Sequence, residues 1–250
     1  MTETRPPVPI DATVYDAFPS LATLHSVVRE HYPDMRETFF WDVFERNKPY
    51  TCLSVERFYN IFKSIEYIAK ANVPGDIVEC GVFLGGSIVG AAEIADHFGL
   101  TERLFYIFDT FEGFPANTFE KDLGGVDTDL STLHLFNNNF RHIVERNIER
   151  SGLSPDRFVL VPGLVEDTLR EPQRLGPVAY LRLDTDYFTS TTIELEALYP
   201  KLSQGGVLIV DDYGHFEGVR AAVDAFFERS SQRPLLLQRV DYTGPSGVKA

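Results

Sequence analysis

The sequence has few cysteines, few basic residues and no long apolar run. Its two cysteines, Cys52 and Cys80, are too few and too isolated for a disulfide framework or a zinc cluster. Lysine and arginine total 23 against 37 acidic residues, and the net charge of -14 opposes binding to the phosphate backbone of nucleic acid. No run is long enough to span a bilayer, and residues 1–11 lack the basic and apolar regions of a secretory signal. We therefore expect a soluble, cytoplasmic protein without a nucleic-acid or membrane partner.

Residues 1–72 have the pattern of a tail followed by helices. Three prolines fall within the first ten residues, which is typical of a mobile terminus. Apolar residues then recur at helical spacing, as at Phe58, Ile61, Phe62, Ile65 and Ile68. We expect this part of the chain to form an N-terminal helical cap.

Short apolar runs alternate with helical stretches in residues 73–250. Parallel strands joined by crossover helices produce this alternation, so we predict an α/β domain with a mostly parallel sheet. The last residues have the pattern of a strand, a turn and a short final strand, which predicts an antiparallel hairpin at the edge of the sheet. The expected strands cover residues 76–80, 103–109, 157–161, 178–184, 206–211 and 235–240.

A long insert, residues 111–150, separates the second and third expected strands. It opens with a polar, glycine-bearing segment and closes with a helix that we expect to carry Phe136, Phe140, Ile143 and Ile148. Long inserts in compact domains are commonly lids, so we predict a lid over about residues 111–140. A surface loop without such a role is the competing interpretation.

Glycines follow the first expected strand at a strand-to-helix turn. Gly81 and Gly85 would let the backbone approach a ligand, and Ser87 begins the next helix. Asp109 ends the second strand, where an acid commonly binds ribose hydroxyls. The dinucleotide and triphosphate fingerprints are absent, so the pattern suits a cofactor without phosphates. Glu79 could meet a cationic amino group, which points to S-adenosylmethionine; a glycine turn kept only for packing is the alternative.

Four aspartates lie at the ends of two later strands, Asp184 and Asp186 after one and Asp211 and Asp212 after the other. The carboxyl ends of parallel strands border one crevice, so we expect Asp184, Asp211 and Asp212 to converge there. Converging carboxylates repel one another unless a cation joins them, and oxygen ligands suit Mg²⁺ or Mn²⁺. The competing interpretation is that these aspartates cap the helices that follow them.

The chain resembles the macrocin O-methyltransferase family, which methylates sugar hydroxyls of macrolides and related glycosides. The resemblance lies in "YTCLSVERFYNIFKSIEY" (50–67), "GDIVECGVFLGGS" (75–87), "DTFEGFP" (109–115), residues 181–226 and the closing hairpin. It implies a class I methyltransferase (Rossmann-like) fold with a seven-stranded sheet, S-adenosylmethionine as cofactor and a homo-oligomer, which we expect to be a dimer. The acceptor would be a small-molecule glycoside of macrolide, aminocoumarin or enediyne type. One departure is Cys52, where the family pattern leads us to expect methionine.

The resemblance also implies roles for the aspartates. By matching position Asp184, Asp211 and Asp212 would hold Mg²⁺, and Asp186 would be the general base, with an indirect metal ligand as its rival role. A sugar hydroxyl is too weak an acid for an ordinary carboxylate, so we expect vicinal hydroxyls to chelate the cation while Asp186 takes the proton. His215 is a candidate second base or acceptor contact, or a structural histidine.

Other functions compete for the same residues. Asp184-Thr185-Asp186 resembles the DxD of metal-dependent glycosyltransferases and the motif of aspartyl-phosphate phosphatases. The first does not explain the glycine turn, and the second prefers its nucleophile on an early strand. A catechol-type O-methyltransferase is a further alternative, and a scaffold without chemistry would be expected to lack the metal-binding acids. We rank the sugar O-methyltransferase first.

Overall fold

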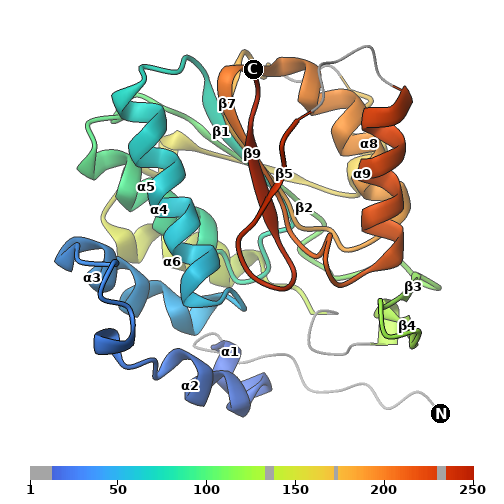
Figure 1. Cartoon of the computed structure of the whole chain (residues 1–250), viewed down its shortest axis with the longest axis horizontal. Coiled ribbons are helices and arrows are strands. Elements are labelled where there is room, and N and C mark those ends of the chain that lie inside the picture. Colours follow the sequence, from blue (N-terminus) through green and yellow to red (C-terminus); the bar gives the residue numbers. More distant parts are fainter. Residues whose placement is uncertain (1–12, 133–137, 172–173, 230–234) are drawn as a thin grey trace.

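A seven-stranded sheet forms the centre of the molecule (Figure 1). The computed structural model describes residues 13–132, 138–171, 174–229 and 235–250. The strand order is β5-β2-β1-β6-β7-β9-β8. β5, β2, β1, β6 and β7 are parallel, whereas β9 runs antiparallel to both of its neighbours. The strands are β1 Asp76–Cys80, β2 Phe105–Asp109, β5 Phe158–Pro162, β6 Val178–Leu183, β7 Leu202–Val210, β8 Gln238–Arg239 and β9 Pro245–Val248.

This arrangement confirms the predicted mostly parallel sheet with a C-terminal antiparallel hairpin. The final strand, β9, lies inside the sheet between β7 and β8, and β8 is the edge. β7 begins at Leu202, four residues before the predicted start at 206, and β8 is shorter than the run expected over 235–240.

Helices cover both faces of the sheet, which explains why its central strands are largely apolar. Ile77 and Ile107 pack with α3 (Thr38–Asn47), α4 (Val55–Lys70) and α5 (Gly86–His97). Val78 and Phe108 point to the other face and pack with α8 (Phe188–Leu198) and α9 (Glu217–Arg229). Successive residues of each strand therefore serve opposite cores.

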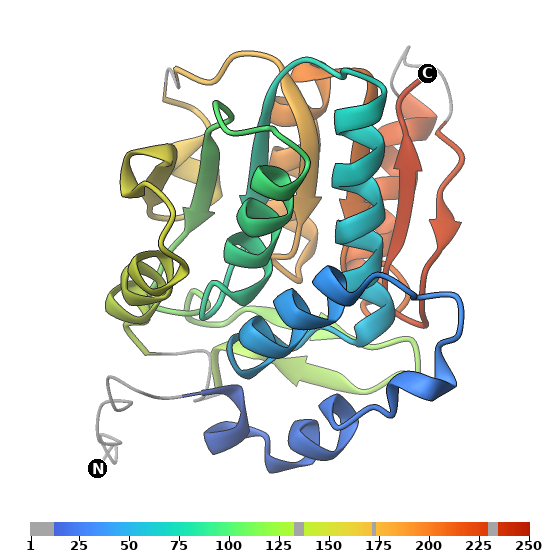
Figure 2. The same ribbon diagram turned by 90° about the vertical axis from the view of Figure 1, so that its left-hand side faces the viewer.

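The N-terminal residues that the structure describes are mainly helical, in agreement with the pattern of their apolar residues. α1 (Val14–Ala17) and α2 (Pro19–His25) lie beyond the carboxyl ends of the parallel strands, whereas α3 and α4 share their apolar core with the sheet (Figure 2). Ser54 caps α4 by accepting a hydrogen bond from the Arg57 backbone N–H at 3.2 Å. In the described ranges no helix has the length and apolar character of a membrane span.

The insert contains more regular structure than its polar sequence indicated. β3 (Phe119–Lys121) and β4 (Asp127–Asp129) form an antiparallel hairpin, and α6 (Arg141–Ser151) closes the insert. Phe140 is the N-cap of α6 and so precedes the helix that we expected to include it; Phe136 lies outside the described residues. Ile143 and Ile148 lie in α6, as predicted, and both are buried. Shorter helices are α7 (Val165–Thr168) and 3-10 turns at Arg29–His31, Lys48–Tyr50, Leu130–Thr132, Pro155–Arg157 and Tyr199–Lys201.

Candidate functional site

A cavity of about 740 Å³ lies at the carboxyl ends of the parallel strands. One part is lined by the turns that follow β1 and β2, and another by the loops that follow β6 and β7. Phe18, Leu21 and Leu24 from the region of α2 contribute a third, largely apolar wall. The volume is in the range of sites that hold small organic ligands. The fold thus brings the glycine turn, the aspartate loops and the N-terminal helices to one cavity.

The glycine turn lines one end of this cavity, through Gly81, Ser87 and the neighbouring Asp109. Gly81 has φ +78°, and a Cβ atom there would overlap with the Asp184 carbonyl oxygen, so only glycine fits. Asp109 Oδ2 accepts a hydrogen bond from Val82 N–H and its Oδ1 accepts one from Phe111 N–H, both at 2.7 Å. Burial raises the pKa of Asp109, and these backbone donors oppose the rise. Asp109 therefore fixes the turn on which a ligand would rest.

Two predicted cofactor residues lie behind the cavity wall instead of on it. Glu79 is fully buried, and its Oε1 accepts hydrogen bonds from Ser87 Oγ and, at 2.6 Å, from Arg182 Nη1. Its Oε2 is buried with no hydrogen-bond partner among the described residues. Burial raises the pKa of Glu79, and Arg182 opposes that shift. Gly85 is the N-cap of α5 with φ +84°, and a Cβ there would press on Val144 at 3.2 Å.

Three of the four predicted aspartates converge at the other end of the cavity. Asp184, Asp186 and Asp212 can each offer one carboxylate oxygen to a cation, with all three oxygens within 4.8 Å of one another. Oδ1 of Asp186 is buried and has no hydrogen-bond partner in the described part of the chain. Asp186 and Asp212 have φ +69° and +57°, values that are uncommon for residues other than glycine and that concentrate at functional sites. Such oxygen-rich convergence fits a hard divalent cation.

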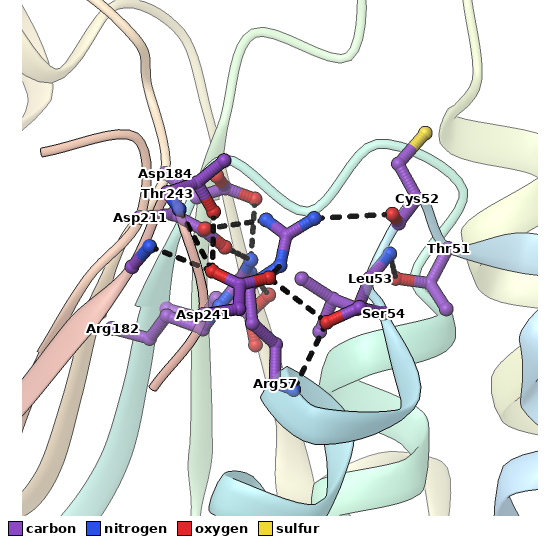
Figure 3. A network of polar contacts seen from close by, with 12 residues as sticks. Thr51, Cys52, Leu53, Ser54, Arg57, Arg182, Asp184, Asp211, Asp241 and Thr243 are labelled. Atoms are coloured by element: carbon purple, nitrogen blue, oxygen red, sulfur yellow. Dashed lines mark hydrogen bonds and ion pairs between the residues drawn. The ribbon is translucent and has the colours of Figure 1, made fainter. Parts of the chain in front are cut away.

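Asp211 is held away from this group by arginine. Its Oδ1 lies 2.6 Å from Arg57 Nη1, and its Oδ2 pairs with Arg182 Nη2. Arg182 Nη2 also lies 2.8 Å from Asp184 Oδ2 (Figure 3). Because Arg182 Nη1 pairs with Glu79, this one guanidinium joins the aspartates to Glu79. The structure therefore places Asp211 beside the other three aspartates but not in the group whose oxygens face one another.

The second arginine of this network, Arg57, comes from the first turn of α4. Its Nε lies 3.1 Å from Asp241 Oδ2, an ion pair without hydrogen-bond geometry, and its Nη2 donates to the Cys52 carbonyl at 3.3 Å (Figure 3). Asp241 also accepts hydrogen bonds from the Ser54 hydroxyl and from backbone N–H groups at 243 and 244. Arg57 thus joins the N-terminal helices, the C-terminal turn and the end of β7.

The charges of the network explain why neighbouring aspartates differ. Burial would raise the pKa of Asp211, but Arg57 and Arg182 outweigh it and hold that pKa below its usual range. Burial raises the pKa of Asp184 well above its usual range in spite of Arg182. Burial and then the charges of Asp212 and Asp184 do the same for the pKa of Asp186. The three cavity aspartates lack enough positive charge, which a cation would supply.

His215 and Cys52 also line the cavity at this end. The backbone N–H of His215 donates to the Asp212 carbonyl at 2.8 Å, and its ring meets Tyr242 edge-on with centroids 6.0 Å apart. The thiol of Cys52, where the family pattern has methionine, is held neutral because burial and the nearby Asp184 charge raise its pKa to about 12. His215 therefore borders the cavity beside the aspartate loops, and Cys52 is not an activated nucleophile.

Sequence reasoning missed Arg57, Arg182 and Asp241. Arg182 did leave a signal, because it is a lone charge within the apolar run "VAYLRL" of β6 and a buried charge requires partners. Arg57 and Asp241 carried none, since each lies in an ordinary polar context and they meet only in the folded chain.

Comparisons with known proteins agree with this geometry. Residues 22–246 match the family described as macrocin-O-methyltransferase (TylF). The chain is 37% identical over 167 residues to the 8-demethyl-8-(2,3-dimethoxy-alpha-L-rhamnosyl)-tetracenomycin-C 4'-O-methyltransferase of Streptomyces olivaceus, a match that covers 66% of this chain and 62% of the relative. It is 33% identical over 169 residues to the mycinamicin III 3''-O-methyltransferase of Micromonospora griseorubida, which covers 66% of this chain and 65% of that relative. The matched region thus spans slightly less than two thirds of these two relatives.

Solved structures extend the likeness to nearly the whole chain. The O-methyltransferase NovP superposes with a TM-score of 0.69 and 26% identity, covering 94% of this chain and 99% of that one. A calicheamicin methyltransferase superposes with a TM-score of 0.62 at 18% identity, covering 99% of both chains, and so shows the fold alone. The sheet is that of class I O-methyltransferases. The chain belongs to the macrocin-O-methyltransferase (TylF) family.

Proposed function

We propose that this protein is an S-adenosylmethionine-dependent O-methyltransferase that methylates a sugar hydroxyl of a glycosylated natural product. The observation that carries the proposal is that one cavity holds both the glycine turn and the three facing carboxylates of Asp184, Asp186 and Asp212. The named relatives act on a rhamnosyl tetracenomycin and on mycinamicin III, and some structural neighbours at under 25% identity contain S-adenosylhomocysteine. These names support the proposed reaction and the proposed acceptor class.

The proposed cofactor end is the turn after β1 together with the end of β2. Gly81 and Ser87 would border the methyl donor, and the backbone held by Asp109 would shape its site. Glu79 Oε2 is buried without a hydrogen-bond partner in the described ranges, so it is the atom left for a cationic amino group or for a water that binds one. The methyl donor and the acceptor would then meet in the middle of a cavity of about 740 Å³.

The proposed cation is Mg²⁺, with Mn²⁺ as a substitute, and the residues present fit it. The donor set is carboxylate oxygen only, and Asp186 Oδ1 is a buried oxygen without a partner among the described residues. When bound, a divalent cation would acidify a coordinated sugar hydroxyl. Asp184 and Asp212 belong both to the set of facing carboxylates and to the set that the sequence predicted, so we propose them as ligands. Asp211, from the sequence, and Asp186, from the geometry, are rivals for the third position.

The proposed mechanism keeps Asp186 as the general base. Methyl transfer from a sulfonium requires the acceptor oxygen in line behind the methyl group, so much of the rate would come from positioning. Asp186 would accept the hydroxyl proton at Oδ1, the buried oxygen that has no hydrogen-bond partner among the described residues. His215 would contact the acceptor, and Phe18, Leu21 and Leu24 would contact its apolar aglycone. We further propose a homodimer as the oligomeric state.

Calorimetric titration of S-adenosylhomocysteine, with and without Mg²⁺, tests the cofactor assignment without knowledge of the acceptor. We expect saturable one-to-one binding in both conditions. A panel of rhamnosyl and other deoxysugar glycosides, assayed for methyl transfer with Mg²⁺ and with a chelator, then tests the acceptor class. A folded protein that binds no S-adenosylhomocysteine in either condition would contradict the proposed function and favour tests with nucleotide-sugar donors.

A further inference from the structure

The β3–β4 hairpin is fixed to the loop that carries Asp212. Leu123 N–H donates to the His215 carbonyl at 2.8 Å, and Asp122 forms an antiparallel bridge with Phe216. The hairpin lies at the same end of the molecule as α1 and α2, beyond the carboxyl ends of the parallel strands (Figures 1 and 2). The predicted lid is therefore in contact with the loop of the proposed cation site.

One side chain of the hairpin, Glu120, reaches both aspartate loops. The central residue of β3, it is 8% exposed, whereas its neighbour Phe119 is 63% exposed, so the strand turns Glu120 inward. Glu120 Oε1 accepts a hydrogen bond from Phe188 N–H at 2.9 Å, and Oε2 accepts one from Gly218 N–H at 3.2 Å. A single carboxylate therefore satisfies one free N–H at the start of each of two helices.

These two helices begin shortly after the loops that carry the facing aspartates. Phe188 is the first residue of α8 and comes two residues after Asp186, and α9 begins at Glu217, five residues after Asp212. The position of each helix start sets the position of the loop before it, because the chain between them is short. Glu120 consequently controls the spacing of the two loops from a third segment of the chain.

Gly218 has no side chain, and this leaves room for the Glu120 carboxylate. A Cβ atom at Gly218 would lie 2.5 Å from Glu120 Oε1 and would overlap with Oε2. Alanine ordinarily favours a helix over glycine, so an alanine at this position would displace the carboxylate without weakening α9 itself. The pair thus offers two independent ways to remove the same contact.

We propose that Glu120 is a positioning residue that docks the insert on both aspartate loops and so sets the geometry of the cation site. The proposal rests on the proposed function, because it takes Asp184 and Asp212 as cation ligands and Asp186 as the carboxylate that faces them. Glu120 acts on them through α8 and α9 and touches neither cation nor acceptor. A residue that only stabilised the hairpin would leave cation affinity unchanged.

The test compares Glu120→Ala, Glu120→Gln, Gly218→Ala and the double variant, with Glu217→Gln as the matched control. Glu217 pairs with Lys121 at 4.0 Å across the same contact, but both side chains are about half exposed, so its loss should change nothing measurable. Mn²⁺ affinity is measured by electron paramagnetic resonance, and S-adenosylhomocysteine affinity by calorimetry. Hydrogen exchange of peptides that contain Phe188 and Gly218 reports the docking itself.

We expect Glu120→Ala to weaken Mn²⁺ binding by about tenfold, as does the loss of a residue that holds metal ligands in place. Hydrogen exchange should become faster at the starts of both helices. Affinity for S-adenosylhomocysteine should stay within about twofold, because independent sites do not share the change. Gly218→Ala should reproduce the loss, the double variant should be no worse than either single one, and Glu120→Gln should recover part of the affinity. Unchanged Mn²⁺ affinity and exchange in Glu120→Ala, or losses that add in the double variant, would overturn the proposal.

A failure of the proposed function can be distinguished from a failure of the proposal for Glu120. If the wild-type protein binds no Mn²⁺ at millimolar concentration, the cation site is wrong and with it the proposed consequence of docking. If the wild-type protein binds Mn²⁺ and the Glu120 and Gly218 variants bind it as tightly as the Glu217→Gln control does, the cation site stands and the role of Glu120 is refuted.

Discussion

The two ends of the cavity are built in different ways. The cofactor end comes from neighbouring stretches, residues 79–87 and 109–111, and is fixed by backbone contacts such as those of Asp109 with Val82 and Phe111. The proposed cation end, which holds Asp184, Asp186 and Asp212 and the ion pairs beside them, combines charges from distant parts of the chain, since Arg57 lies 154 residues from Asp211 in the sequence. A short motif can therefore specify a turn, whereas a cluster of charged side chains requires partners that only the complete fold brings together.

Gly81→Ala should have the largest effect and should impair both ends of the cavity, because Gly81 lies in the glycine turn and contacts the Asp184 backbone. Its φ of +78° disfavours alanine, and the new Cβ would overlap with the carbonyl oxygen of Asp184. We expect a loss of stability of about 3 kcal/mol or more from strain and overlap combined. Urea unfolding measures that loss, and binding of both S-adenosylhomocysteine and Mn²⁺ should fall together. Wild-type affinity for either ligand would show that the ends are less tightly joined at this point.

Asp186→Asn and Asp211→Asn should separate the rival roles at the cation end. If Asp186 is the base, its replacement should lower the rate of methyl transfer by about 10²–10⁴ with little change in Mn²⁺ affinity. Asp211→Asn should then be the variant that weakens Mn²⁺ binding. The opposite pattern, with Mn²⁺ affinity lost only in Asp186→Asn, would assign Asp186 as the third ligand and exclude it as the base.

Arg57→Gln should affect the proposed cation end and leave the proposed cofactor end unchanged. Removing one partner of a buried ion pair costs about 3 kcal/mol because it leaves the other charge uncompensated. The side chains of Arg57 and Asp211 are 18% and 1% exposed, so little solvent screening relieves that cost. We expect lower stability and altered Mn²⁺ affinity, while S-adenosylhomocysteine affinity is kept.

The matched control for this variant is Arg157→Gln. Arg157 forms an ion pair with Asp96 and donates to backbone carbonyls at 100 and 103. It lies before the first residue of β5, at the opposite end of the parallel strands from the aspartate loops. It should lower stability and leave the affinities for both ligands as in the wild type. If Arg57→Gln were equally silent in Mn²⁺ affinity, the arginine network would be a structural feature without influence on the cation.

Glu194→Gln should have the smallest effect on either end and a visible effect on pH dependence. Burial raises the pKa of Glu194 to about 8, and its Oε1 accepts from Thr185 Oγ1 at 2.9 Å. Between the ordinary carboxyl pKa and about 8 the folded state binds the extra proton, so stability falls as pH rises through this window. One group contributes a slope of at most about 1.4 kcal/mol per pH unit. Urea unfolding from pH 5 to 9 should show this fall in the wild type and a flatter curve in Glu194→Gln; equal slopes would refute it.

The regular parts of the fold could be predicted because their signals are local. Strands buried on both faces are apolar runs, and β1, β2, β5 and β6 were placed within two residues of their observed starts. The β3–β4 hairpin was missed because Phe119 and Val126 are exposed at 63% and 59%, so it has no buried apolar face to give a pattern. Phe140 misled the helix prediction, because it is buried as the N-cap of α6 and not as part of it.

The candidate site was predictable to a similar degree. Sequence reasoning brought Gly81, Ser87, Asp109 and the aspartates to one crevice, since strand ends in a parallel sheet must share an edge. It expected Glu79 to meet a cationic amino group, and did not foresee that Glu79 lies behind the cavity wall and pairs with Arg182. It could not foresee that two arginines turn Asp211 away from the other aspartates, because Arg57 comes from a helix with no sequence link to β7.

The most direct test of the account is one titration of Mn²⁺ into the chelator-stripped wild-type protein, with three readouts. Cation occupancy, S-adenosylhomocysteine affinity and methyl transfer to an accepted glycoside are measured at each concentration. We predict that methyl transfer rises in proportion to occupancy from near zero, while S-adenosylhomocysteine affinity stays constant throughout. Methyl transfer that persists without the cation would contradict the role given to Asp184 and Asp212, and cofactor affinity that follows occupancy would contradict the independence of the two ends.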